Sequence, residues 1–349
     1  MLLSRGGSHR TSVDAELVRW ASPLARAEGR LVPDRSVEVV LARQGPSAGR
    51  KRIRVGGVPR RAAGLPSVLR SVVFAPEDML LVVGPPGLRR AALDALAAQR
   101  HPAYARDLAT YGRALAQRNA LLRAIREEQA GRDALPPWDA ALLDAGAAVV
   151  AARLGLLAEL APALAAAHTE IAPGEGLLAA TYESNAAALP GEGPRDALAR
   201  RLLETVEKEA WHGSTLVGPH RDDLAFRLDG RDMAGFASRG QQRTAILAWK
   251  LAELDLLTAV DGQPPLLLLD DVFSELDPAR RAHLVRRIAG LPQAFVTTTT
   301  LADLDPDLRA HAAAWEVVPD DGTGARLLGP SPAAAQAGPP AGLLSERTR

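Results

Sequence analysis

Two adjacent carboxylates at the end of a leucine run are the residues best placed to do chemistry. Leu266–Leu269 predicts a fully buried strand of the continuous apolar kind that parallel sheets use, and Asp270 and Asp271 follow where it leaves the core. Because side chains alternate along a strand, Asp270 can hold Mg²⁺ while Asp271 projects the other way and orients an attacking water. The alternative is a strand that ends in an ordinary polar turn.

The residues directly after this pair allow two interpretations. Ser274-Glu275-Leu276-Asp277 precedes Pro278. With Asp277 as N-cap and Pro278 as the first helical residue, the segment would simply begin a helix. The segment also resembles the D-loop of ABC ATPases, and Ser274 and Asp277 would then belong to an element that reaches across a dimer interface.

A third group of residues lies upstream, at the distance of one helix plus a loop. Ser238 and Gln241 have the spacing of a capping box, and Gly240 leaves the backbone open to close approach. The free N–H groups of a helix N-terminus bind anions. In ABC ATPases this element is the signature motif, which binds the γ-phosphate of the nucleotide held by the other subunit. An ordinary capped helix is the alternative, but the order of the three motifs favours the ATPase.

Two further polar segments stand at the ends of predicted elements. Thr297, in the run 297–300, ends a strand where ABC proteins place a sensor of the γ-phosphate, although β-branched residues are also common in any strand. The segment 218–223, Gly-Pro-His-Arg-Asp-Asp, contains one His and two Asp and could bind a metal. Adjacent carboxylates in a turn rarely converge on one ion, so we favour a salt-bridged, capped turn.

The elements that must position these residues form an α/β pattern interrupted by helices. Short strands are predicted within 31–58, and a buried strand at 68–74. Helices are predicted over about 88–126, with the spacing of an antiparallel hairpin, and over 138–168 and 198–211. The α/β pattern then resumes with a strand at 224–228, an Asp-Gly hairpin turn, helices at 239–258 and 279–289, and a second buried strand at 294–298.

This order predicts an ATPase head built from two separate parts of the chain. The head comprises 1–87 and 206–329, and the helical segment 88–205 forms a lobe inserted between them. Residues 330–349 are rich in Pro, Ala and Gly, which predicts a disordered tail.

The composition of the 349 residues excludes several classes of protein. There is no Cys, so disulfides and thiolate metal sites are excluded, and a reducing cytoplasm is the expected location. No run of eighteen apolar residues occurs and the N-terminus does not resemble a secretory signal, so no membrane span is predicted. The formal net charge is +1, so any contact with nucleic acid must come from local patches.

Two sets of basic residues are candidates for contact with DNA phosphates. The first set is Arg50, Lys51 and Arg52, in a cluster that continues to Arg61 across a predicted hairpin. The second set lies in the helical segment and includes Arg113 and Arg118. A solvated face in an Arg-rich protein would explain the same pattern.

Taken together, these motifs resemble the RecF family of bacterial recombination mediators, which are relatives of the SMC proteins. The match covers nearly the whole chain, and its most characteristic segments are 218–224, Gly-Pro-His-Arg-Asp-Asp-Leu, and the Asp-Asp-x-x-Ser-Glu-Leu-Asp run that begins at Asp270. It also includes the segments 7–11, 74–78, 84–90, 117–119, 238–243 and 296–299.

The resemblance implies a fold and a function. The fold would be an α/β ABC-type P-loop ATPase head with an inserted, mainly helical second lobe. Such a protein binds ATP with Mg²⁺, dimerises on ATP, hydrolyses it slowly in a DNA-dependent reaction and binds DNA. It works with RecO and RecR to load RecA at single-strand gaps during DNA replication and repair, and it takes part in the SOS response.

One departure from the family pattern concerns the phosphate-binding loop. Family members begin with a strand, a Walker A loop close to Gly-x-x-Gly-x-Gly-Lys-Thr, and a helix. Here the lysines are Lys51, Lys208 and Lys250, and none precedes Ser or Thr. We expect a strand, loop and helix of roughly thirty to forty residues to be missing upstream, because of a late start site or a truncation. Natural loss of nucleotide binding is the alternative.

Without this loop the 349-residue chain is expected to bind ATP poorly. A non-catalytic DNA-binding scaffold is therefore a second possible function. A transporter ATPase subunit is a third, but it is disfavoured because the chain has Ser-Arg-Gly-Gln-Gln at 238–242 in place of Leu-Ser-Gly-Gly-Gln.

Overall fold

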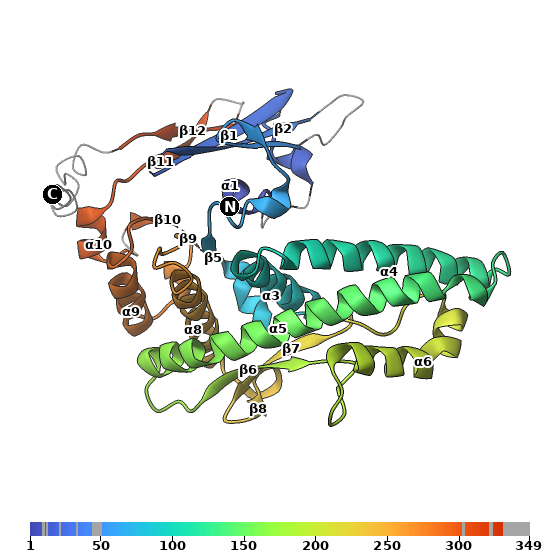
Figure 1. Ribbon diagram of the computed structural model, residues 1–349. Helices are drawn as coiled ribbons and strands as arrows, with labels where there is room; N and C mark the ends of the chain where they lie inside the picture. Colours follow the sequence, from blue (N-terminus) through green and yellow to red (C-terminus); the bar gives the residue numbers. More distant parts are fainter. Residues whose placement is uncertain are drawn as a thin grey trace, which may run out of the picture. The chain divides into compact units, whose positions relative to one another are not determined.

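The computed structural model describes residues 1–8, 11, 13–20, 22–32, 34–43, 51–301, 304–320 and 324–330 (Figure 1). By its internal contacts the chain divides into two compact units. The first comprises Met1–Arg60 and Leu269–Arg349, and the second comprises Arg61–Leu268. Nearly all of the predicted disordered tail, 330–349, lies outside the described residues.

The N-terminal part of the first unit is an antiparallel sheet in the order β1-β2-β3-β4. In β2 every second side chain is buried, and Val37, Val39 and Leu41 form the apolar face of the sheet. A Gly56-Gly57 turn, with positive φ at both residues, joins the last two strands. The strands predicted within 31–58 are confirmed as β2 (Arg35–Ala42) and β3 (Lys51–Val55), and the short β4 (Val58–Pro59) follows them. Strand β1 (Leu24–Leu31) precedes that segment and was not predicted.

The C-terminal part of the first unit holds three helical segments, a strand and a hairpin. Helix α9 (Pro278–Ala289) is confirmed as predicted, and the short η5 (Phe273–Glu275) and α10 (Pro306–His311) were not predicted. Strands β11 (Glu316–Asp320) and β12 (Gly324–Leu328) pair as an antiparallel hairpin that was also not predicted. The N-terminal α1 (Leu2–Arg5) and η1 (Asp14–Leu17) complete this unit.

The strand that carries the leucine run, β9, lies in a separate three-stranded sheet with the order β10-β9-β5. Strand β9 is Leu266–Asp270, β10 is Ala294–Thr297 and β5 is Ser71–Phe74. The prediction that β9 and β10 are fully buried is wrong. Leu267 and Leu269 are buried, but Leu266 and Leu268 are half-buried, and Phe295 of β10 is 51% exposed. Strand β10 is partly exposed because it lies at the edge of the described sheet, where β9 is its one neighbouring strand.

The second unit is built mainly from helices. Helices α4 and α5 lie side by side as an antiparallel pair, joined at one end by a loop (Figure 1). The hairpin partner of α4 is thus α5, whereas the sequence spacing placed the hairpin within 88–126. The helices are α2 (Leu80–Val83), α3 (Pro86–Arg100), α4 (Tyr104–Arg126), α5 (Pro136–Ile171), α6 (Pro194–His212), α7 (Met233–Phe236) and α8 (Arg239–Thr258).

An antiparallel sheet in the order β6-β7-β8 also belongs to the second unit. Strand β7 (Asp223–Leu228) and the turn at Asp229-Gly230 into β8 (Arg231–Asp232) confirm the predicted strand and hairpin. Strand β6 (Leu178–Glu183) was not predicted and lies within the segment expected to be helical. The contact-based units change at 60/61 and 268/269, whereas the predicted boundaries are 87/88 and 205/206. The division into ATPase head and helical lobe stays a prediction.

Helix α5 is long and apolar enough, by length and composition alone, to cross a membrane. Its apolar residues are used within the unit, because α5 packs against α4, α6, α8 and β6. It also carries Arg153, which is buried and paired with Asp94. These contacts are those of a core helix in a globular unit.

Candidate functional site

The ends of β9 and β10 bring together two residues that were predicted from separate motifs. Thr297 Oγ1 donates a hydrogen bond of 2.6 Å to Asp270 Oδ1. A carboxylate that accepts from a fixed hydroxyl is held in one orientation. The candidate sensor of the γ-phosphate and the candidate Mg²⁺ ligand therefore lie in direct contact.

The next residue, Asp271, has a left-handed backbone with φ of +52°. Its N–H donates to Thr297 O at 3.1 Å and to Thr297 Oγ1 at 3.2 Å, and these bonds hold that conformation. The atom Asp271 Oδ1 is buried and has no hydrogen-bond partner among the described residues. A strained backbone and an unsatisfied acceptor are features that cluster at functional sites.

The segment after Asp271 is fixed by short-range hydrogen bonds. Ser274 Oγ donates to Asp271 O at 2.8 Å. Asp277 caps α9, because its Oδ1 accepts from Arg280 N at 2.9 Å and its carboxylate also pairs with the Arg280 guanidinium. The backbone N–H and the guanidinium of Arg280 hold the pKa of Asp277 below its usual range. The capping role is confirmed, and the D-loop role stays a prediction.

The predicted capping box at the start of α8 is present in the second unit. Gln241 N donates to Ser238 Oγ at 3.2 Å, and Ser238 N donates to Gln241 Oε1 at 3.0 Å. Ser238 is exposed and Gly240 is half-buried, so the first turn is accessible. The first N–H groups of a helix have no acceptor within the helix. The cap occupies that of Gln241, and those of Arg239 and Gly240 can bind an anion.

The segment 218–223 is a turn fixed by ion pairs and hydrogen bonds. Arg89 binds Asp223 with two hydrogen bonds of 2.7 and 2.8 Å. Burial alone would raise the pKa of Asp223, but its hydrogen bonds and ion pair with Arg89 hold that pKa below its usual value. Asp222 is fully buried and accepts from Tyr182 Oη at 2.6 Å and Asn185 N at 2.8 Å, and burial raises its pKa. In the part of the chain that the structure describes, no group of His, Asp and Glu could hold a metal. The salt-bridged turn is confirmed, because Asp223 is bound to Arg89 and Asp222 to Tyr182.

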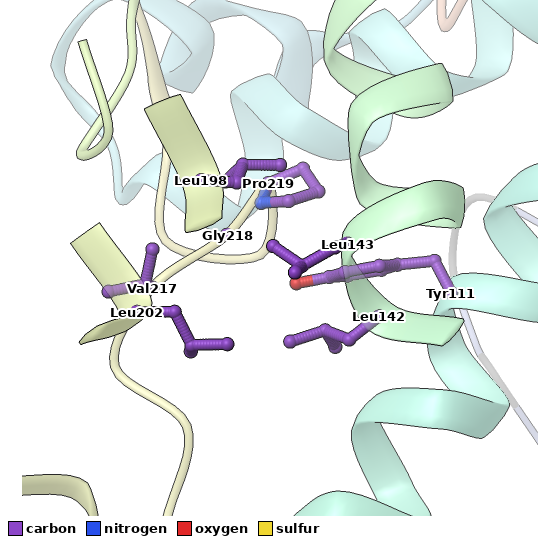
Figure 2. Close-up of a pocket in the computed structure, with 8 residues that line it drawn as sticks. All are labelled: Tyr111, Leu142, Leu143, Leu198, Leu202, Val217, Gly218 and Pro219. Atoms are coloured by element: carbon purple, nitrogen blue, oxygen red, sulfur yellow. The ribbon is translucent and has the colours of Figure 1, made fainter. Parts of the chain in front are cut away.

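Tyr111 packs against this turn and bonds to its histidine. Figure 2 shows the Tyr111 ring between Leu142 and Leu143, with its hydroxyl end directed toward Gly218. The pocket around it is apolar and has a volume of about 10 Å³, so it holds at most one water molecule. Tyr111 Oη lies 2.5 Å from Nδ1 of His220, and His220 Nε2 lies 3.2 Å from the Thr215 carbonyl. Since a carbonyl only accepts, Nε2 carries the proton and Nδ1 accepts from Tyr111.

His220 should make stability depend on pH. Burial, together with the positive charges of Arg221 and Arg90, lowers the pKa of His220 from 6.5 to about 4. Below pH 6.5 the unfolded chain binds a proton that the folded chain does not yet bind. The His220 contribution to stability is therefore present above that pH and is lost as pH falls toward 4, by at most about 1.4 kcal/mol per pH unit.

The measurement is urea unfolding of the native chain and of His220→Gln between pH 7.5 and pH 4. Gln cannot titrate, so the stability advantage of the native chain over the variant should shrink across this window. An advantage that stays constant with pH would show that His220 does not cause the dependence.

The structure shows which of the basic residues predicted to contact DNA are exposed. Arg118 is fully buried and bonded to Glu209 and Asp139, each at 2.6 Å, so it presents no charge to DNA, and that prediction is wrong. Lys51 is half-buried and pairs with Asp14 at 2.8 Å. Arg52 and Arg113 are exposed and stay candidates, and Arg50 lies outside the described residues.

A buried polar cluster was missed by sequence reasoning. Arg153 donates to Asp94, to Tyr182 Oη at 3.2 Å and to the Pro219 carbonyl at 2.8 Å, and Tyr104 also binds Asp94. Burial raises the pKa of both tyrosines, so their hydroxyls stay protonated. The available signal was an arginine inside an otherwise apolar helical run, since such a residue needs a buried partner.

Comparison with known proteins identifies the family, although no family model matches the chain. The chain is similar to "DNA replication and repair protein RecF" of Bacillus velezensis, with 38% identity over 86% of this chain and 82% of the relative. The corresponding protein of Heliobacterium modesticaldum is 40% identical over 86% of this chain and 81% of its own length.

A solved structure shows the same fold. It is described as the recombination mediator protein RecF with ATP in the RecFOR pathway. It is 32% identical, covers 87% of this chain and 82% of its own, and has a TM-score of 0.79. By its description, this relative binds ATP. The chain belongs to the RecF family of DNA replication and repair proteins, and its fold is that of an α/β ABC-type ATPase head.

Proposed function

We propose that the chain is an ATP-dependent, DNA-binding recombination mediator that acts at single-strand gaps, where it promotes RecA loading and the SOS response. The observation that carries the ATP-dependent part is the contact of Asp270, Thr297 and Asp271 at the ends of β9 and β10. The DNA-directed part is supported by the names of the relatives, which are DNA replication and repair proteins.

The residues present fit a nucleotide with Mg²⁺. Asp270, oriented by Thr297, has the oxygen chemistry that Mg²⁺ prefers. Mg²⁺ bound to ATP would supply stabilisation of the charge on the transferred phosphoryl group. Asp271 has a buried Oδ1 with no partner among the described residues, so that this atom can accept a proton from a water and orient it.

The remaining motif residues suit a site that two chains complete. We assign Ser238, Gly240 and Gln241, at the open start of α8, to the γ-phosphate of a nucleotide held by a second copy of the chain. Ser274 and Asp277 would lie at the interface of the same ATP-dependent homodimer. RecO and RecR are the proposed partners, in keeping with the RecFOR pathway named for the solved relative, and the cytoplasm is the proposed location.

Replacing Asp271 by Asn tests the catalytic assignment. The protein should be prepared with any in-frame residues that its gene encodes before Met1, because none of Lys51, Lys208 and Lys250 precedes Ser or Thr. Loss of the carboxylate should lower DNA-stimulated ATP hydrolysis by about 100-fold or more. Binding of gapped DNA in the presence of ATP should be retained, since the change leaves the backbone hydrogen bonds of residue 271 in place.

The matched control is Asp305→Asn, because Asp305 caps α10 and Asn caps a helix equally well. It should hydrolyse ATP at the native rate. Native hydrolysis by the Asp271→Asn variant would contradict the assignment. If DNA bound equally well with and without ATP, a non-catalytic DNA-binding scaffold would be the better description of the protein. For the 349-residue chain alone we expect an affinity for ATP weaker than micromolar.

A further inference from the structure

A pocket of about 410 Å³ lies within the second unit, and none of the proposed nucleotide-site residues lines it. Its walls are one face of α3, one face of α4, Arg153 of α5, and Pro219 with His220. Pockets for small organic ligands have volumes of about 300–1,000 Å³, so its size suits such a ligand. The segments 84–90 and 218–223 both contribute to it, and the proposed ATPase chemistry uses neither.

The positive charges around this pocket are not equally neutralised. Arg153 pairs with Asp94 at 2.8 Å. Arg90 instead donates to the backbone carbonyl of Asp222 at 2.7 Å, and within the described ranges no carboxylate lies at ion-pair distance from it. A guanidinium has five N–H donors, so Arg90 keeps donors for a further acceptor. It is therefore the group in the pocket best able to bind an anion.

The surroundings of Arg90 add to its positive field. Its Nη2 atom lies 3.9 Å from the position that a Cβ on Gly87 would take, beside the first turn of α3. This helix of fifteen residues has no side-chain cap at its N-terminus, so its positive dipole end is not compensated there. The low pKa of His220, caused first by burial and then by Arg221 and Arg90, is consistent with a positive potential.

The pocket also has an apolar wall. Leu108 and Leu115 of α4, Ala91 of α3, Pro219 and the Tyr111 ring line it. An apolar wall together with a small number of polar groups is the usual design of an organic-ligand site. Such a wall takes a flat ring or a sugar, whereas a bare inorganic ion would leave it in contact with water.

We infer that this pocket binds a nucleoside monophosphate group, with the phosphate at Arg90 and the start of α3 and the ring against Leu108, Leu115 and Pro219. A free mononucleotide and the 5′-phosphate end of a DNA strand both carry this group. An arginine with free donors suits a phosphate, because two parallel N–H groups can bind two of its oxygens. The site is separate in its residues from Asp270, Asp271 and Thr297, and it does not depend on ATP hydrolysis.

Titration with three probes tests the inference: AMP, a 5′-phosphorylated oligonucleotide and the same oligonucleotide with a 5′-hydroxyl. The affinity is measured by calorimetry, and the His220 imidazole resonance reports binding in this pocket. AMP or the 5′-phosphorylated strand should move that resonance, and the 5′-hydroxyl strand should move it less. Preference for AMP would identify a free nucleotide, and preference for the phosphorylated strand would identify a DNA end.

Two variants and a control make the test specific. Arg90→Gln should weaken binding by about tenfold or more, because a charge-assisted hydrogen bond is lost. Gly112→Leu should block the pocket, and it should fold normally because Gly112 lies in α4 with nothing within 4 Å of an added Cβ. Arg106→Gln, an exposed arginine of the same helix that does not line the pocket, should bind as the native chain does.

Two results would overturn the inference. One is a His220 resonance that does not move with either phosphorylated probe at millimolar concentration. The other is unchanged affinity in both Arg90→Gln and Gly112→Leu, which would place any measured binding elsewhere in the protein.

Discussion

Replacing Gly218 by Ala is expected to lower the free energy of unfolding by about 2–6 kcal/mol. Two effects combine at this position. The φ of Gly218 is +132°, a conformation that L-residues rarely adopt, and it costs roughly 1–3 kcal/mol. An added Cβ would also overlap the Tyr111 hydroxyl and lie 3.3 Å from His220 Nδ1, and overpacking of this kind costs roughly 1–3 kcal/mol more. Urea unfolding followed by circular dichroism measures the change.

The matched control is the same substitution at Gly155, inside α5. An added Cβ there has nothing within 4 Å, so Gly155→Ala should stabilise the protein by roughly 0.5–1 kcal/mol. Adding Tyr111→Phe to Gly218→Ala removes the overlapping oxygen and should recover part of the loss, whereas the backbone strain remains. An unchanged unfolding midpoint in Gly218→Ala would refute the account of this turn.

Replacing Arg118 by Met is expected to destabilise the protein by about 3–5 kcal/mol, because it leaves a buried carboxylate without its partner. Arg118 and Glu209 are both fully buried, and their side chains are 2.6 Å apart. The same guanidinium also binds Asp139 and donates to Thr215 Oγ1 at 2.9 Å. Met keeps most of the side-chain volume, so the loss measures charge and hydrogen bonding more than packing.

Arg113→Met provides the comparison in the same helix. Arg113 is exposed, so Arg113→Met should change the free energy of unfolding by no more than about 0.5 kcal/mol. The pair also separates DNA binding from folding. If Arg118 contacted DNA, its replacement would reduce the salt dependence of DNA binding in chains that are still folded. We expect Arg118→Met to leave the salt dependence of DNA binding unchanged. A free energy of unfolding equal to that of the native chain would contradict the buried ion pair.

Elements with local signals could be predicted from the sequence, and their bounds were accurate. Helix α8 begins and ends where predicted, because the Ser238 capping box and the apolar periodicity mark it in adjacent residues. The contact of Asp270 with Thr297 was not predicted, although both residues were identified separately at the ends of their strands. The hairpin turn at Asp229-Gly230 was equally local.

The predictions that were wrong concerned residues and strands whose partners are distant in the sequence. The burial of Arg118 is decided by Glu209, far along the chain, and nothing near Arg118 indicates that carboxylate. Strand β6 carries a weak pattern and becomes a strand by pairing with β7. The half-exposed β10 likewise reflects its edge position, which a run of apolar residues cannot reveal.

The interrupted first unit sets an order on biosynthesis. Its two segments flank the second unit, which occupies Arg61–Leu268 without interruption. A ribosome makes the chain from its N-terminus, so the entire second unit emerges before Asp270, Asp271 and Thr297 are translated. The contact between Asp270 and Thr297 is consequently among the last to form, and a nascent chain that stalls after the second unit lacks Asp270, Asp271 and Thr297 altogether.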